Sequence, residues 1–142
     1  DRPLNERGKR DAPFMAQRLL DKKISIDLFI SSPAKRAKKT AEIFVKEFGG
    51  DKEAILFHEN LYLAVPPVFF DVISKTNDSV NSIAIFSHNP GITDFANLLT
   101  NARIDDIPTC GIFAAKIKSD SWKYFEEAKQ EFWFFDYPKF GL

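Results

Sequence analysis

The residue best placed for chemistry is His88, in the segment SIAIFSHNPGITDFANLL from Ser82 to Leu99. The apolar run 83–86 suits a strand buried on both faces. Asn89 followed by Pro90 is typical of a helix N-cap with proline at the first helical position. His88 is therefore expected beside the unpaired N–H groups of a helix start, where anions bind. A histidine at this point has few packing reasons to be there, so we interpret it as functional.

A second segment has the same order of features. Residues 26–30 form a strand candidate, and Ser31 or Ser32 can cap the helix that follows. Pro33 opens that helix, and Arg36 lies one turn in, where a guanidinium can grip two phosphate oxygens. On spacing alone, an ordinary surface arginine explains Arg36 equally well. Together, the two helix starts indicate a phosphate-binding site.

Other candidates for chemistry are weaker. His58 follows a short strand candidate, where a solvated or core histidine is the better interpretation, and its neighbour Glu59 is a possible acid. Cys110 has no second cysteine to pair with, and an idle thiol is the expected state. The two histidines and the one cysteine of the chain are not spaced in the sequence as the ligands of a metal site usually are, so no metal site is predicted. It also lacks the glycine-rich and GxSxG motifs of nucleotide-binding proteins and serine hydrolases.

Composition narrows the class of protein. The 142 residues, 44% hydrophobic, fit one domain over residues 1–142. Twenty basic residues balance twenty acidic ones, so no nucleic-acid partner is expected. No apolar run approaches the roughly 20 residues of a membrane span, so no membrane partner is expected either. A single cysteine and the absence of a signal peptide favour the cytoplasm.

Helices and strands are predicted to alternate along the chain. Apolar spacing and turn residues predict helices over 5–22, 33–48, 66–75 and 90–100, and strands over 26–31, 54–57, 83–86, 111–118 and 130–136. The last two strands are expected to pair, with a helical turn between them. The fold class is then α/β, a mostly parallel sheet with helices on both faces. Ligands gather outside the carboxyl ends of such strands, where both helix starts lie.

Four motifs occur in order: RPLNERG at 2–8, SSPAKRAKKTAE at 31–42, ENLYLA at 59–64 and SHNPGI at 87–92. This combination resembles the histidine phosphatase superfamily, in particular its short, single-domain phosphohistidine phosphatases of the SixA type. The resemblance covers nearly the whole chain. It implies a three-layer, phosphoglycerate mutase-like fold and phosphoryl transfer through a phosphohistidine on the enzyme, with no metal or other cofactor.

The resemblance also implies roles for single residues. Arg36 matches the second phosphate-clamping arginine, and His88 matches the second histidine, which hydrogen-bonds the transferring phosphoryl group. Arg2 matches an arginine near the pocket. Ser32 and Asn89 are weaker candidates for binding substrate, because their expected place as helix caps already accounts for them.

The nucleophile of the family is not among these residues. It is the histidine of an Arg-His-Gly or Arg-His-Ala motif at the end of a first strand that should precede RPLNERG. His88 is already matched and His58 follows a different strand, so neither replaces it. Without that strand, two strand edges and a large apolar surface would be exposed. We therefore expect the strand in a segment before Asp1, and expect residues 1–142 alone to be inactive.

The expected function is hydrolysis of phosphohistidine on a protein, in signal transduction. No long insertion is present that could close a lid over a metabolite, which favours a protein substrate. One alternative is a small-molecule phosphatase of the same superfamily, whose partner is a small phosphorylated molecule. Another is a non-catalytic phosphate-binding regulatory module that keeps the pocket without the nucleophile.

Overall fold

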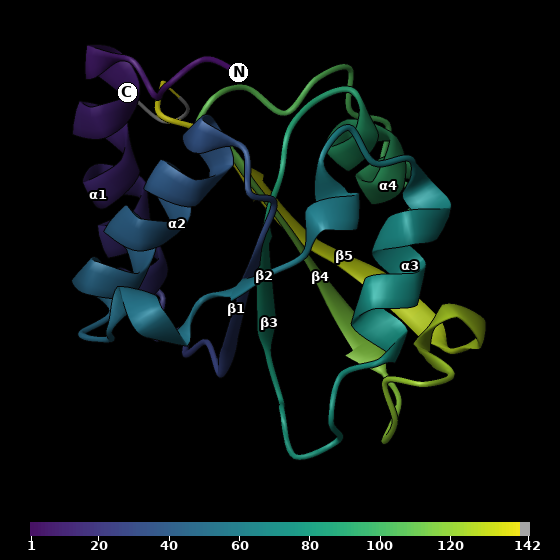
Figure 1. The fold of residues 1–142 in the computed structure, drawn as a ribbon. Coiled ribbons are helices and arrows are strands. Elements are labelled where there is room, and N and C mark those ends of the chain that lie inside the picture. Colours follow the sequence, from purple (N-terminus) through teal and green to yellow (C-terminus); the bar gives the residue numbers. More distant parts are fainter. Residues whose placement is uncertain (140–142) are drawn as a thin grey trace.

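The computed structural model describes residues 1–139 and arranges them in three layers, with strands between two pairs of helices (Figure 1). The elements in chain order are α1 (Glu6–Asp21), β1 (Leu28–Ser31), α2 (Lys35–Glu47), η1 (Lys52–Ala54), β2 (Leu56–Phe57), η2 (Glu59–Leu61), α3 (Pro66–Ser74), β3 (Ile83–Phe86), α4 (Gly91–Leu99), β4 (Ile112–Lys118), η3 (Phe125–Glu127) and β5 (Lys129–Asp136). Helices α1 and α2 cover one face of the strands, and α3 and α4 cover the other. The predicted α/β class is confirmed. No helix among the described residues combines the length and apolar character that crossing a bilayer requires.

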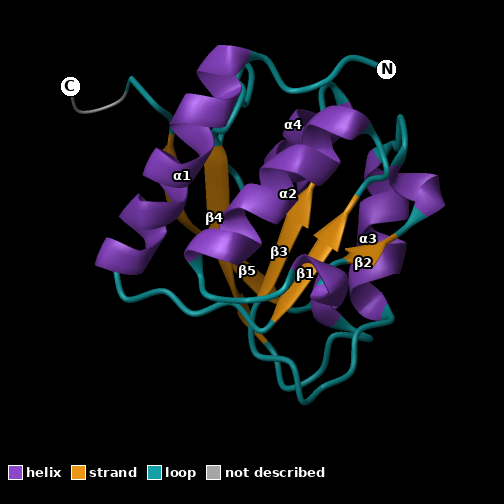
Figure 2. Ribbon diagram, turned by 60° about the vertical axis from the view of Figure 1, so that its left-hand side comes forward, coloured by secondary structure: helices purple, strands orange, loops and turns teal. Residues whose placement is uncertain are grey.

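Strands β2, β1 and β3 form a parallel sheet in that order (Figure 2). β1 and β3 pair in register, with Ser31 opposite Phe86, and the backbone N–H of Ser32 donates to the carbonyl of Phe86 at 2.9 Å. Because side chains alternate along a strand, Phe29 packs with α1 and α2 while Ile30 packs with α3. This register brings the carboxyl ends of β1 and β3, and the residues that follow them, to one edge.

Two hydrophobic cores lie on the two faces of this sheet. The apolar face of α1 is buried in the core between α1, α2 and the strands; its members are Ala12, Met15, Ala16 and Leu19. The second core lies beneath α3 and α4 and centres on Phe69, Phe95 and Phe125. The aromatic rings of Phe69 and Phe95 stack with centroids 5.0 Å apart. Burial of apolar side chains in each core therefore holds each helix pair on its own face of the sheet.

β4 and β5 form a separate antiparallel pair, as predicted, with one register shift between Ala114 and Ala115. Between β3 and β4 lies a cavity of about 1120 Å³, hereafter the slot, lined by residues of both strands. Ser82 and Phe86 direct their carbonyls to the β1 side, so the period of two turns the backbone groups of Ile83 and Ile85 toward the slot. Within residues 1–139, these two strand edges face each other without pairing.

The slot corrects one expectation for residues 83–86. The run is covered by helices on both faces, as predicted, since Ala84 and Phe86 pack in one core and Ile83 and Ile85 in the other. All four residues nevertheless stay partly exposed, because the second edge of β3 opens into the slot.

The predicted caps of two helices are wrong. α2 begins at Lys35, two residues after Pro33, and the carboxylate of Asp1 accepts its backbone N–H at 3.2 Å. α4 begins at Gly91 with Pro90 as N-cap, and no side chain caps it. At α2 the carboxylate comes from Asp1, far away in the chain, and at α4 the side-chain oxygen of Asn89 accepts the hydroxyl of Thr93 in place of a backbone N–H.

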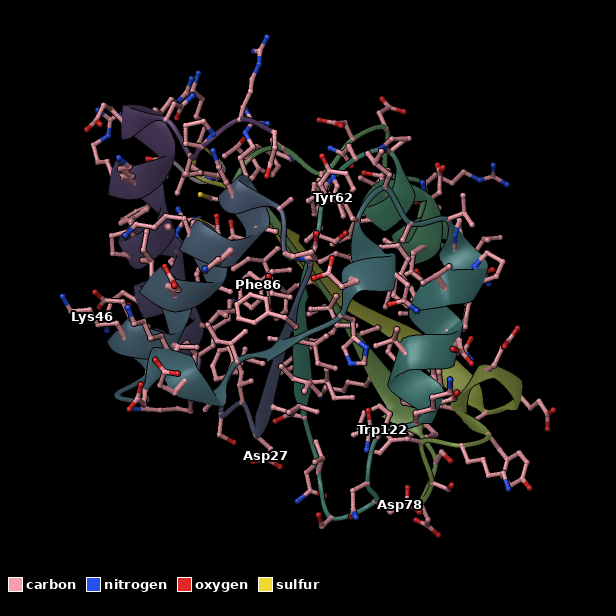
Figure 3. The ribbon with its side chains drawn as sticks, in the orientation of Figure 1. Asp27, Lys46, Tyr62, Asp78, Phe86 and Trp122 are labelled. Carbon is pink, nitrogen blue, oxygen red and sulfur yellow. The ribbon has the colours of Figure 1, made fainter. Side chains whose placement is uncertain are left out.

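Hydrogen bonds brace the hairpin β4–β5 against the rest of the fold. The indole N–H of Trp122 donates to the carbonyl of Val80 at 2.7 Å, and its backbone N–H donates to Asp78 at 2.9 Å (Figure 3). At the other side, the guanidinium of Arg18 in α1 contacts the buried carboxylate of Asp136 in β5 at 2.6 Å. The hairpin is thereby fixed at both ends.

Replacing Asp136 by Asn tests this brace. The substitution removes the charge that Arg18 contacts in a largely buried site, so we expect the free energy of unfolding to fall by about 1–3 kcal/mol. Urea denaturation measures the change. Asp71→Asn is the matched control, because the Asp71–Lys75 pair on α3 is solvent-exposed and should contribute less than about 0.5 kcal/mol. Equal effects of the two substitutions would contradict the structural role of the Arg18–Asp136 pair.

Candidate functional site

The parallel register of β1 and β3 brings the two predicted segments together. The hydroxyl of Ser32 lies 3.3 Å from Nε2 of His88, although the two residues are 56 positions apart. Ser32 is fully buried, and its Oγ also accepts the backbone N–H of Ala34 at 3.2 Å. The Ser32 hydroxyl is therefore held in a fixed position beside the imidazole. The segments that follow β1 and β3 lie side by side, as expected.

The electrostatic surroundings keep His88 neutral at pH 7. Burial is the larger cause that lowers the pKa of its imidazole, and the positive charge of Arg36 lowers it further. The ring of Tyr62, from the loop before α3, lies tilted against the imidazole with ring centroids 5.7 Å apart. A neutral imidazole has one N–H and one lone pair, so it can donate a single hydrogen bond to a phosphate oxygen.

Two arginines lie at the mouth of the slot together with His88. Arg36 comes from the first turn of α2, as predicted, and Arg2 comes from the segment before α1. Both side chains are exposed, and within residues 1–139 neither guanidinium takes part in an ion pair or a side-chain hydrogen bond. Their charge is therefore available for an anion that enters the mouth.

The side chain of Asn89 has partners in the protein. Its amide donates to the carboxylate of Asp106 and to the carbonyl of Ile107, each at 2.8 Å, and its oxygen accepts from the hydroxyl of Thr93. The backbone N–H of Ile107 donates to Thr93 in turn at 3.0 Å. Asn89 thus anchors the loop after α4 next to His88, and its role in binding substrate stays a prediction.

The remaining candidates lie outside the mouth. His58 donates its backbone N–H to Ser31, and Glu59 is exposed at the start of η2; neither lines the slot. Cys110 lies in the wall of the slot, where burial is the larger of two causes that raise the pKa of its thiol to about 11, the other being the charge of Asp11. Among the described residues, no group of three or more potential ligands could hold a metal ion.

Sequence reasoning missed the residues that support His88. Asp1, Tyr62 and Asp106 act through contacts with partners far away in the chain. For Tyr62 alone a local signal existed, because it lies inside the ENLYLA motif.

Comparison with known proteins agrees with this geometry. Residues 1–61 match the family described as the histidine phosphatase superfamily, branch 1. A 53-residue stretch, 37% of the chain, is 43% identical to the mitochondrial serine/threonine-protein phosphatase Pgam5 of Drosophila ananassae and spans 18% of that protein. An uncharacterised protein of Mycobacterium leprae is 27% identical over 148 residues, which cover 98% of this chain and 88% of that protein.

Solved structures match nearly the whole chain. A structure described as the phosphohistidine phosphatase SixA from Nakamurella multipartitia superposes with a TM-score of 0.80 at 16% identity, covering 98% of this chain and 86% of the other. The protein histidine phosphatase SixA complexed with tungstate matches with a TM-score of 0.80 at 20% identity, covering 96% and 85%. These likenesses confirm the phosphoglycerate mutase-like fold. The family match over residues 1–61 agrees with the predicted resemblance to the histidine phosphatase superfamily.

Substitution of Arg36 by Met should raise the pKa of His88, because it removes one of the two causes that lower it. Below the unfolded-state pKa of about 6.5, the unfolded chain binds more protons than the folded one, so stability falls with decreasing pH, and less steeply in the variant. An NMR titration of the histidine Cε1–H signals measures the shift, with His58→Gln for assignment. The matched control Lys39→Met, on the same helix but outside the mouth, should leave the pKa unchanged. An identical titration of the Arg36 variant and the parent would contradict the assigned cause.

Proposed function

Because the chain shares the motifs and the fold of the histidine phosphatase superfamily, we propose that it is a phosphatase domain, residues 1–142, acting on phosphohistidine of a protein through a phosphohistidine intermediate. The observation that carries this proposal is the meeting of His88, Arg36 and Ser32 at the carboxyl edge of a parallel sheet. The site of action would be the cytoplasm, without a cofactor and without a nucleic acid or membrane as partner.

The proposed reaction has two steps. First, a nucleophilic imidazole nitrogen forms a bond to phosphorus while the bond from phosphorus to the substrate imidazole breaks, and the substrate leaves after taking up a proton. Water then attacks the phosphoenzyme, the nitrogen–phosphorus bond breaks, and inorganic phosphate is released. Arg36, Arg2 and the N–H of His88 would neutralise the charge that spreads over the phosphoryl oxygens in both steps. The rate enhancement then rests on positioning and electrostatics.

The nucleophile would come from a strand that fills the slot. The backbone groups of Ile83 and Ile85 face the slot, and its walls are largely apolar, as an inserted strand requires. Asp1 lies at the mouth of the slot, at the carboxyl edge of the sheet. A segment that precedes Asp1 and runs parallel to β3 would therefore end beside His88 and present its last side chains to the same phosphate.

Two other functions make different predictions. A small-molecule phosphatase would use the same residues but would not distinguish a phosphoprotein from a phosphorylated metabolite. A regulatory module would bind phosphate or a phosphopeptide without turnover. The slot favours the enzyme over the module, because the same strand that covers the open edges would bring a nucleophile to the mouth.

Removing the guanidinium of Arg36 tests the clamp. In the natural-length protein, Arg36→Ala should lower kcat/KM on a phosphohistidine peptide roughly 30- to 1000-fold. This corresponds to the loss of about 2–4 kcal/mol of transition-state stabilisation, because one strong donor to the transition state is removed. Lys39→Ala removes an equal charge from the same helix away from the mouth and should change kcat/KM less than about twofold. Unchanged turnover of the Arg36 variant would overturn its assignment.

The source of the nucleophile is tested by comparing two chains. Mass spectrometry and N-terminal sequencing of the natural protein test whether a segment precedes Asp1. The natural protein should form an acid-labile phosphoenzyme on a histidine of that segment, and replacing this histidine by Ala should abolish it. Residues 1–142 alone should bind tungstate without forming a phosphoenzyme. A phosphoenzyme on His58 or His88 would contradict the proposed nucleophile, and binding without turnover in both chains would favour the regulatory module.

A further inference from the structure

Three apolar side chains stand exposed beside the mouth, on the segment between η2 and α3. Tyr62, Leu63 and Val65 keep 43%, 72% and 58% of their surface accessible, and we name them the 62–65 ridge. Tyr62 and Leu63 line the same mouth as Arg36 and His88. Figure 3 shows Tyr62 at the carboxyl edge of the strands, on the outer surface of the molecule. A phosphate held at the mouth would therefore bring its neighbouring atoms onto the ridge.

The ridge is held firmly by the residues around it. Leu61 is fully buried, and its carbonyl accepts the hydroxyl of Ser87 at 3.4 Å. The carbonyl of Ala64 packs so closely on Gly91 that a Cβ there would lie 2.0 Å from the oxygen. The ridge is thus clamped against β3 and the start of α4, the same elements that position His88.

The backbone of Leu63 has an unfavourable conformation for its side chain. Its φ is +55°, in the left-handed region that costs a non-glycine residue about 1 kcal/mol. Packing does not explain the choice of leucine, because this side chain is the most exposed large hydrophobic residue among those described. A large apolar side chain held in this way next to a site indicates a contact made with another molecule.

We propose that the 62–65 ridge binds the apolar side chains that flank the phosphorylated histidine of a polypeptide substrate. This inference rests on the proposed function and names the substrate surface that the site accepts. Small phosphorylated metabolites are mostly rich in hydroxyl groups, which need several hydrogen-bond partners, whereas among the ridge side chains the Tyr62 hydroxyl is the single such group. Side chains such as leucine, in contrast, gain by leaving water against the ridge. The arginines select the phosphate and the ridge selects its surroundings.

The test uses the natural-length protein and three defined substrates. These are free phosphohistidine and two synthetic peptides with one phosphohistidine, flanked on both sides by two leucines or by two serines. The parent should hydrolyse the leucine peptide with a kcat/KM about tenfold above that of the serine peptide, equivalent to about 1.4 kcal/mol. Leu63→Asn, which changes no charge beside the two arginines, should reduce this preference to less than about twofold, mainly through KM, and should change kcat/KM on free phosphohistidine by less than about twofold.

Leu98→Asn is the matched control. Leu98 is 66% exposed on α4 but does not line the mouth, so the preference for the leucine peptide should persist. Leu63→Asn should fold, because asparagine tolerates the left-handed region better than leucine. Retained preference in the Leu63 variant, or equal loss in the Leu98 variant, would overturn the ridge while leaving the phosphatase intact. Absence of turnover on all three substrates would instead overturn the proposed function.

Discussion

The parallel pairing of β1 with β3 is the constraint on which the rest of the structure depends. The bond from Ser32 N–H to the Phe86 carbonyl fixes the register. A slip of one residue would turn Phe29 and Ile30 to the wrong cores and move Ser32 from His88 by one strand residue, about 3.3 Å. The hydrophobic effect that sorts side chains between two helix layers therefore also sets the geometry of the phosphate site.

The slot links folding to chemistry. The slot lies between β3 and β4. Each of these strands is already paired along its far edge, and the two helix pairs cover the two faces of the slot. A strand that entered would satisfy both edges, bury residues 83–86 and join the two sheets. The same strand would end where Asp1 caps α2 and where His88 and Arg36 meet. In the proposed enzyme, the strand that completes the core also carries the nucleophile to the phosphate site.

Local patterns were sufficient to predict the elements. Apolar spacing predicted the helices α1, α2 and α3, and Pro66 and Pro67 form the first turn of α3. Cross-chain contacts were not predictable in this way. The cap at α2 was wrong because the carboxylate of Asp1 accepts the first backbone N–H, and the cap at α4 was wrong because the oxygen of Asn89 accepts the hydroxyl of Thr93. His88 was identified because it lies two residues after β3, and Arg36 because it lies in the first turn of the helix that follows β1, whereas Tyr62 reaches His88 only through the path of the η2 loop.

The lowered pKa of His88 leaves the arginines as the main positive groups of the pocket. Burial and Arg36 both disfavour an imidazolium, so the positive potential of the empty mouth comes from the guanidinium groups. A phosphate dianion at the mouth would oppose both effects and draw the pKa of His88 upward. The charged form of the imidazole would then be less disfavoured when the anion is present. A permanently charged His88 would gain little in the transition state over the ground state, whereas a charge that responds to the phosphoryl group can favour the transition state.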